Sequence, residues 1–193
     1  MTDTILDKEQ KLVQLLEQTF KKLSGKVVRQ RRVTVSVEKE LVPSVLSYAK
    51  SQLGYIHLSH ISCVDWPENN NFEIIYILWS PADKVQLFIK TLINRENPEI
   101  DNVDMIWKHA NTYEREIREM YGIQFNGLVG AQEFILEDWD DMPPMRRDFD
   151  TVDYVDNNYT FRPGREDAGD VREEIIKRSG EDIPDFAKKY SRD

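Results

Sequence analysis

Residues 72–93 read FEIIYILWSPADKVQLFIKTLI, and this stretch decides the class of fold. Two β-rich runs, Phe72 to Trp79 and Val85 to Ile93, flank the segment Ser80 to Asp83, whose residues are common in turns. A third run of the same kind, Tyr55 to Val64, precedes them. Because strands that follow one another through short turns usually pair with their neighbours, the sequence predicts an antiparallel meander.

The sequence on the N-terminal side of the meander predicts two helices with a strand between them. Apolar residues recur at helical spacing from Ile5 to Leu23 and again from Leu41 to Leu53. The segment Val33 to Val37 alternates apolar with polar residues, which predicts a half-buried strand that begins near Val27. A helix, a strand, a helix and then consecutive strands predict an α+β fold, in which helices cover one face of a mostly antiparallel sheet.

The sequence on the C-terminal side of the meander predicts one further helix. Asn94 to Asp104 is rich in Asn, Glu and Asp, which indicates a surface connection. Asn111 and Glu114 have the spacing of a capping box, so we expect a helix to begin there. Gly122 is a natural end for this helix, because glycine adopts the left-handed conformation that often terminates helices.

A change in composition predicts a domain followed by an appendage. The chain has 193 residues, which fits one domain with an added segment better than two full domains. We expect residues 1–149 to form the α+β domain. In residues 150–193 apolar residues are sparse, so we expect an extended C-terminal arm that becomes ordered by packing on a partner, with a short helix from Val171 to Ser179.

Charge and cysteine content exclude several kinds of function. The chain carries 26 Lys plus Arg against 35 Asp plus Glu, a formal net charge of -9, which opposes general attraction to nucleic acid. A nucleic-acid binder that works through Arg29 to Arg32 is a remote alternative. Cys63 is the single cysteine, so the chain cannot supply four cysteines to an iron–sulfur cluster. The three histidines fall in no recognised zinc spacing, and we expect no metal and no cofactor.

The sequence predicts no insertion into a membrane. It contains no apolar run long enough to cross a bilayer, and Met1 to Thr4 do not begin a signal peptide. We therefore expect the chain to reside in the cytoplasm. Any association with a membrane would then occur only through other subunits.

Two motifs resemble those of a known family. The first is an Ala-Asn-aromatic-Glu-Arg-Glu run followed by an apolar residue, an acidic residue, Gly-Ile and Phe-x-Gly. Its matches here are Ala110, Asn111, Glu114, Arg115, Glu116, Ile117, Glu119, Gly122, Ile123, Phe125 and Gly127. The second, Pro-Leu-Arg-Lys-Asp-Phe, is similar to Pro144 to Phe149. On these motifs the chain resembles the 30-kDa subunit family of complex I, the type of the NADH dehydrogenase C subunit, from roughly Val27 to Phe149.

The resemblance implies a non-catalytic structural subunit in the peripheral, hydrophilic arm of a membrane-bound oxidoreductase complex. The implied partners are the large hydrogenase-like subunit and the iron–sulfur small subunit, on the cytoplasmic side of the cell membrane. After Gly127 this chain continues as Leu128 to Phe134, where respiratory members commonly have His-Pro. That departure favours the branch of energy-converting hydrogenases and sulfur-reducing relatives. The C subunit of a respiratory NADH:quinone oxidoreductase is the alternative.

The two motifs also supply the candidate site. The residues expected at a partner interface are Glu114, Arg115, Glu116, Arg118, Arg146, Arg147, Asp148 and Phe149. On a helix Glu114 with Arg118, and Arg115 with Glu119, could instead form local i,i+4 salt bridges, worth roughly 0.2–0.5 kcal/mol each. The last four could form a solvated turn. A stand-alone acid–base enzyme using Glu114, Glu116 or Asp138 is a remote alternative, and we expect no catalytic residue.

Overall fold

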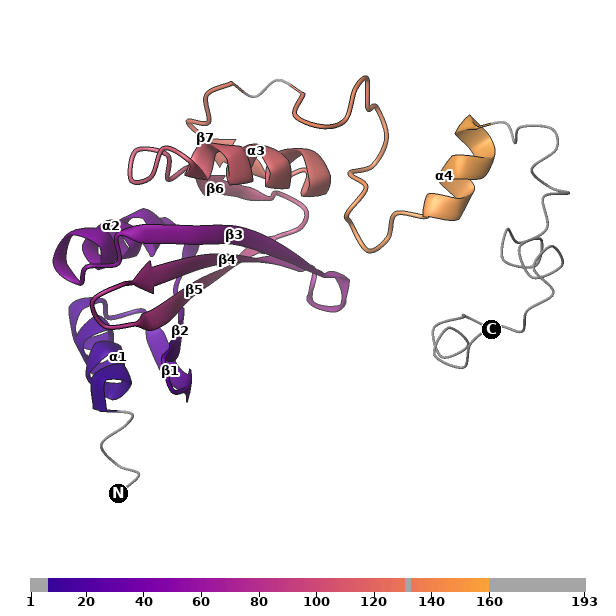
Figure 1. The fold of residues 1–193 in the computed structure, drawn as a ribbon. Helices are drawn as coiled ribbons and strands as arrows, with labels where there is room; N and C mark the ends of the chain where they lie inside the picture. Colours follow the sequence, from indigo (N-terminus) through magenta and orange to yellow (C-terminus); the bar gives the residue numbers. More distant parts are fainter. Residues whose placement is uncertain (1–6, 131–132, 160–193) are drawn as a thin grey trace, which may run out of the picture. The chain divides into compact units, whose positions relative to one another are not determined.

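The computed structural model describes residues 7–130 and 133–159 of the chain. The chain divides into two units, Met1–Phe149 and Asp150–Asp193, and each is described by itself. In the first unit the elements follow in the order α1 (Asp7–Thr19), β1 (Ser24–Arg29), β2 (Arg32–Ser36), η1 (Lys39–Leu41), α2 (Val42–Gln52), β3 (His57–Trp66), η2 (Pro67–Asn69), β4 (Asn71–Ser80), β5 (Val85–Asn94), β6 (Glu99–Asp101), α3 (Ala110–Tyr121) and β7 (Gln124–Asn126) (Figure 1).

The main sheet confirms the predicted meander. Its strands lie in the order β1-β2-β5-β4-β3, and β3, β4 and β5 pair antiparallel. The β4–β5 register runs without a break from Asn71 opposite Asn94 to Ser80 opposite Val85, because the turn between them is short. The pair β2–β5 is parallel, so the sheet is mostly rather than wholly antiparallel.

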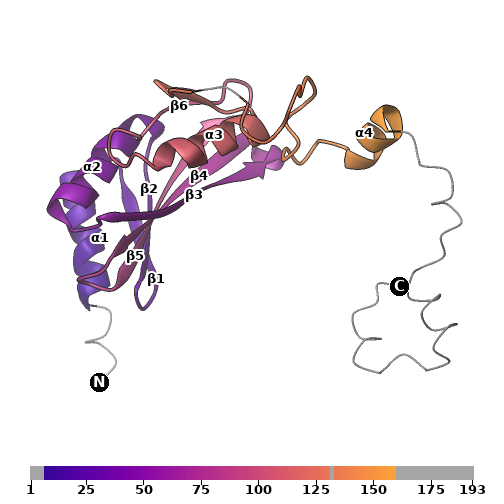
Figure 2. The ribbon, with the colours of Figure 1, turned by 45° about the horizontal axis from the view of Figure 1, so that its top comes forward.

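Helices cover one face of this sheet, as predicted. Along β4 the side chains of Phe72, Ile74, Tyr76 and Leu78 are fully buried, while the intervening residues are half-buried. This alternation arises because successive side chains of a strand point to opposite faces. Buried residues of α1 and α2 join the same core, and the two helices lie beside each other (Figures 1 and 2). Burial of each large aliphatic side chain contributes about 1.5–3 kcal/mol.

The third helix covers the outer edge of β3. Side chains from α3 and the residues before it donate hydrogen bonds to carbonyl groups on or beside this strand. The bonds are Trp107 Nε1 to Ile56 O (2.9 Å), His109 Nε2 to Leu58 O (2.9 Å), Tyr113 Oη to Ser59 O (3.2 Å) and Tyr121 Oη to Cys63 O (3.2 Å). Because an unpaired strand edge invites association with other chains, this cover fixes α3 and protects the edge. His109 is accordingly a structural histidine.

The strand expected to begin near Val27 is in fact a hairpin of β1 and β2. Arg31, between the strands, has a φ of 63°. Gly, Asn or Asp usually occupies such a left-handed position, so an arginine there gave no turn signal. Its carbonyl accepts the Gln86 N–H at 2.8 Å, which ties the turn to β5.

The structure around α3 differs from the prediction in two details. The connection Asn94 to Asp104 contains the short strand β6. This strand pairs in parallel with β7, the strand that follows α3 in the sequence. The helix begins at Ala110 without a side-chain cap, and the Asn111 amide instead donates to Val129 O at 2.9 Å. The end of the helix is as predicted, because Gly122 has a φ of 75° and its N–H bonds Arg118 O.

The second unit is described as far as residue 159, and it contains the helix α4 (Thr151–Asn158). Asp150 caps this helix, since its Oδ1 accepts the N–H groups of Val152 at 2.9 Å and Asp153 at 3.1 Å. Only an extended arm was expected here. The helix predicted from Val171 to Ser179 lies outside the described residues. Within residues 7–130 and 133–159, no helix is long and apolar enough to cross a membrane.

Candidate functional site

The second motif forms a turn, residues 143–149, that is attached to the end of α3. The Met145 N–H donates to Met120 O at 3.0 Å, and Arg146 Nε donates to Tyr121 O at 2.8 Å. These carbonyls lie in the last turn of the helix, where they lack helical partners and where a cation is favourable. The Arg146 guanidinium also lies 5.3 Å from the centroid of the Phe72 ring. The first arginine of the motif therefore caps α3.

Glycine is required at the point where this turn meets the helix. Gly122 has a left-handed φ of 75°. A Cβ at this position would lie 3.0 Å from both Arg146 Nη2 and Pro143 Cγ. A side chain here would therefore be strained in its backbone and would also press on the arginine cap.

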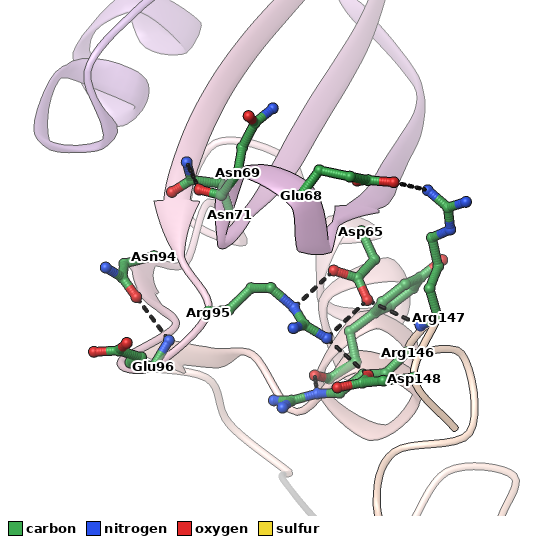
Figure 3. Close-up of polar contacts among 11 residues, drawn as sticks. Asp65, Glu68, Asn69, Asn71, Asn94, Arg95, Glu96, Arg146, Arg147 and Asp148 are labelled. Atoms are coloured by element: carbon green, nitrogen blue, oxygen red, sulfur yellow. Dashed lines mark hydrogen bonds and ion pairs between the residues drawn. The ribbon is translucent and has the colours of Figure 1, made fainter. Parts of the chain in front are cut away.

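Asp65, at the end of β3, joins the turn to the sheet (Figure 3). Its side chain is 1% exposed; Oδ1 lies 2.8 Å from Arg95 Nε, and Oδ2 accepts from Arg95 Nη2 at 3.1 Å. The same Oδ2 accepts the Arg147 N–H at 2.9 Å. Arg95 also forms an ion pair with Asp148, in which Nη2 lies 2.8 Å from Oδ1. The buried carboxylate of Asp65 and the nearly buried guanidinium of Arg95 thus join the end of β3, the end of β5 and the turn.

The second arginine of the motif presents its side chain to solvent. Arg147 Nη1 lies 3.2 Å from Glu68 Oε1, and the two side chains are 57% and 63% exposed. Such exposed pairs contribute little to stability, typically below about 1 kcal/mol. The Arg147 backbone is therefore fixed by Asp65 while its guanidinium is accessible.

On α3 the carboxylate of Glu119 organises the loop that leads to the turn. It accepts three consecutive backbone N–H groups, from Phe134 (2.6 Å), Ile135 (2.8 Å) and Leu136 (3.2 Å). Partial burial opposes ionisation, but these three bonds and nearby Arg115 outweigh it and hold the pKa of Glu119 below its usual value. Arg115 stacks 4.9 Å from the centroid of the Phe134 ring. Arg115 and Glu119, for which an i,i+4 salt bridge was expected, thus each contact the loop, Arg115 through Glu133 O and the Phe134 ring and Glu119 through three backbone N–H groups.

Glu114, the first acidic residue of the signature, is fully buried. Its Oε1 accepts the Val103 N–H at 2.6 Å, and within the described residues its Oε2 has no hydrogen-bond partner. Burial raises the pKa of Glu114 to about 7, against the opposing effect of the Val103 N–H and with a further contribution from Asp104. The expected capping bond to Asn111 is replaced by this contact, which fixes the chain before α3.

The structure separates the eight expected interface residues by their accessibility. Arg147 and Asp148 are exposed, while Arg115, Glu116, Arg118, Arg146 and Phe149 are half-buried. The centroid of the Phe149 ring lies 5.7 Å from that of the Trp139 ring. Glu114 lies inside, so its side chain cannot reach a partner in this conformation. Contact of the remaining residues with a partner stays a prediction.

The structure also includes residues that sequence reasoning did not assign to the site. Arg95 and Glu68 bind the turn from 53 and 79 positions away in the sequence, and no local pattern marks such distant contacts. Asp65 directly follows the β-rich run Tyr55 to Val64, and its role in joining the turn to the sheet has no sequence signal. Glu119 was recognised as a motif residue, and its role in holding the loop was not.

The residues of the acid–base alternative do not share one pocket. Glu114 is buried against Val103, whereas Glu116, two positions along the same helix, points in a different direction. Asp138 is exposed in the loop. In residues 7–130 and 133–159, no group of three or more His, Cys, Asp or Glu is arranged to hold a metal ion.

Comparison with known proteins agrees with this architecture. The family model described as the respiratory-chain NADH dehydrogenase 30 Kd subunit matches residues 35–155. The C subunit of F(420)H(2) dehydrogenase from Methanosarcina mazei is 34% identical over 124 residues, which are 62% of this chain and 76% of that protein. The C subunit of NADH-quinone oxidoreductase from a Chelativorans species is 31% identical over 145 residues, 72% of each chain.

A solved structure extends the likeness to three dimensions. A chain of the membrane-bound sulfane sulfur reductase, an archaeal respiratory membrane complex, superposes with a TM-score of 0.74 at 26% identity. The match covers 82% of this chain and 97% of that chain. The present chain belongs to the family of the complex I 30-kDa subunit. It is a subunit of a complex I-related complex.

Proposed function

We propose that this chain is a non-catalytic structural subunit in the peripheral arm of a complex I-related membrane-bound oxidoreductase, such as an energy-converting hydrogenase or a sulfur-reducing relative. It docks on the large hydrogenase-like subunit, beside the iron–sulfur small subunit, and supports electron transfer by holding these neighbours in place. It performs no chemistry and carries no cofactor of its own. Other subunits attach it to the cytoplasmic side of the membrane, and its arm, residues 150–193, packs on them.

One observation carries this proposal: charged residues of both motifs, together with Asp65, bind backbone groups of the chain itself. Glu119 holds three N–H groups of the loop, Arg146 caps α3, and Asp65 holds the Arg147 N–H. Charges used in this way order a surface rather than bind a substrate. Because the turn is ordered before any partner arrives, less conformational entropy is lost on docking.

Arg147 and Asp148 are the motif residues best placed to contact the large subunit. Both are exposed, and hydrogen bonds on either side of them fix their backbone. An arginine in this position can pair bidentately with a carboxylate across an interface. Its exposed pair with Glu68 is weak enough to be exchanged for such a contact.

The test is to purify the complex from native membranes through a tag on the large subunit and to measure how much of this chain accompanies it. The variant Arg147→Glu should reduce recovery about tenfold or more, since it places like charges at the interface. Lys22→Glu is the matched control, because Lys22 forms a similarly exposed pair with Glu38 on another surface. Wild-type protein recovered without the large subunit, or equal recovery of the two variants, would reject the proposal.

A second candidate is the C subunit of a respiratory NADH:quinone oxidoreductase. It is favoured by the 31% identity to the Chelativorans protein over 72% of both chains. The purified complex distinguishes the two candidates. NADH oxidation by a complex that holds a flavin-bearing subunit would indicate the respiratory enzyme, whereas nickel in the large subunit without NADH oxidation would indicate a hydrogenase.

A further inference from the structure

The loop and turn beside the end of α3 expose large apolar side chains, of which Ile135 and Met145 are the most exposed, although both segments are held by hydrogen bonds. Ile135 is 61% exposed and Met145 is 52% exposed. The Ile135 N–H is bound by Glu119 and the Met145 N–H by the carbonyl of Met120, the next residue of the helix. Residues ten positions apart in the sequence are therefore brought to the same end of α3. We call Ile135 and Met145 the apolar pair.

The backbone around the apolar pair is ordered at several points. Besides the three N–H groups bound by Glu119, Trp139 Nε1 donates to the carbonyls of Asp141 (3.0 Å) and Met142 (3.1 Å). The Trp139 ring also contacts Phe149. Exposed apolar side chains on a backbone that is already ordered can be buried by a partner at a small entropic cost. Methionine also adapts its shape readily at binding surfaces.

Between the members of the apolar pair the chain is strongly acidic. Glu137, Asp138 and Asp140 are all exposed. Within residues 7–130 and 133–159 none of the three takes part in an ion pair. These three carboxylates fall within four consecutive residues of the chain, so they repel one another. A partner that supplies positive charge would relieve this repulsion while it buries the apolar pair.

We propose that the apolar pair and the carboxylates of Glu137, Asp138 and Asp140 together form a docking surface for a basic face of a neighbouring subunit. That face offers an apolar socket bordered by Lys or Arg side chains. This inference rests on the proposed function and specifies the chemistry of the partner. A second copy of this chain does not fit, because it would bring two acidic surfaces together, and an anionic lipid surface is excluded for the same reason.

The apolar part of this proposal is tested with Ile135→Asp in the native complex, purified through a tag on the large subunit. Leu15→Asp is the control, because Leu15 is 41% exposed on α1 and lies outside the residues that match the family. We expect Ile135→Asp to speed the loss of this chain from the complex about tenfold, since a charge would enter the socket. The control should leave the rate unchanged. Thermal unfolding of both variants shows whether either has lost its fold.

The electrostatic part is tested with the double variant Glu137→Lys/Asp140→Lys and with salt. The control, Asp7→Lys/Glu40→Lys, changes the net charge by the same amount at exposed positions elsewhere. We expect wild-type chain to leave the complex faster as the NaCl concentration increases. At low salt we expect Glu137→Lys/Asp140→Lys, called the acidic-loop variant, to leave about tenfold faster than the control. A release rate that does not depend on salt, or equal release rates of the two double variants, would overturn the proposal that the partner surface is basic.

Two other outcomes also decide the matter. Self-association of the purified chain that Ile135→Asp abolishes would show that the occupant is a second copy. If wild-type chain accompanies the complex but neither Ile135→Asp nor the acidic-loop variant weakens its retention, this docking surface is wrong and the proposed function stands. If wild-type chain never accompanies the large subunit, the proposed function fails and the inference fails with it.

Discussion

The β1–β2 hairpin and the turn at residues 143–149 both carry adjacent arginines, but the fold surrounds them differently. In the hairpin, Arg31 is exposed, and Arg32 donates to the neutral Gln86 side chain at 3.3 Å and lies 4.8 Å from the centroid of the Phe88 ring. The Arg31 backbone is held at both ends, since its N–H donates to the buried Glu9 carboxylate of α1 at 2.7 Å and its carbonyl accepts the Gln86 N–H. The guanidinium of Arg32, in contrast, contacts residues of the adjacent strand β5.

In the turn the same residue type connects separate elements. Arg146 donates to the end of α3, and the Arg147 N–H binds the buried carboxylate of Asp65, which also pairs with Arg95. The composition of the two segments does not explain this contrast. Both double arginines are held through a backbone N–H on a carboxylate, but only in the turn does an arginine side chain, that of Arg146, also hold a helix.

The largest expected effect tests whether Asp65 is what makes the turn different. Asp65→Ala would leave Arg95 nearly buried without its main partner, and we expect a loss of about 3–5 kcal/mol in the free energy of unfolding. Arg32→Ala in the hairpin should lower it by less than about 1 kcal/mol. Urea denaturation of both variants gives the two values. Similar losses would erase the distinction between the two segments.

The next effect concerns the buried acid of the helix to which the turn is attached. The pKa of Glu114 is raised from 4.5 to about 7 in the folded chain, so the folded state binds its proton more tightly than the unfolded state. The contribution of Glu114 to stability is then greatest below pH 4.5, falls as the pH rises to 7, and stays constant above that. The total loss is about 3 kcal/mol, at about 1.36 kcal/mol for each pKa unit.

Glu114→Gln isolates this effect, because the amide oxygen can still accept the Val103 N–H and cannot ionise. Denaturation of wild-type and variant chains at several pH values should show that the difference between them grows from pH 4.5 to pH 7 in favour of the variant. A pH-independent difference would show that Glu114 does not titrate in this range.

A smaller effect is expected at the glycine where the turn meets α3. Gly122→Ala should destabilise the chain by about 2–3 kcal/mol, because it adds left-handed strain and a contact with Arg146 and Pro143. Gly54→Ala is the control, since Gly54 has a similar φ of 71° with nothing within 4 Å of an added Cβ. We expect about 1 kcal/mol there. Equal losses would mean that the arginine cap moves aside freely.

The smallest effect should have the opposite sign and lies in the hairpin. Arg31→Gly removes the strain of a φ of 63° from a residue whose side chain anchors no other segment, and we expect a gain of up to about 1 kcal/mol. Thermal or urea unfolding measures it. A clear destabilisation would show that the Arg31 side chain contributes to the fold and that the two segments are more alike than the contacts indicate.

Much of the fold followed from patterns that lie within single elements. The alternation of Phe72 to Trp79, the helical spacing of Leu41 to Leu53 and the stop at Gly122 each reflect the local geometry of one strand, helix or helix end. The hairpin at Arg31, the strand Glu99–Asp101 and the helix Thr151–Asn158 were not predicted. The first has an unusual turn residue, and the second depends on a partner strand across α3.

For the candidate site, the sequence located the motif residues and not their partners. Arg146 and Arg147 were recognised, but nothing in the local pattern shows that one caps a helix and the other binds Asp65 through its backbone. Glu114 was expected at the surface and is buried, because an acidic residue in a charged run resembles a solvated one until its neighbours are known.

By itself the sequence determined the meander, the helices beside it and the family, because these depend on periodicity and on residues close together in the chain. Tertiary structure alone decided which charges face inward, which backbone groups they bind and which apolar side chains remain exposed. These properties depend on groups that meet only after folding, such as Asp65 and Arg147, which lie 82 positions apart in the sequence. Burial then strengthens their interaction, since water no longer screens it.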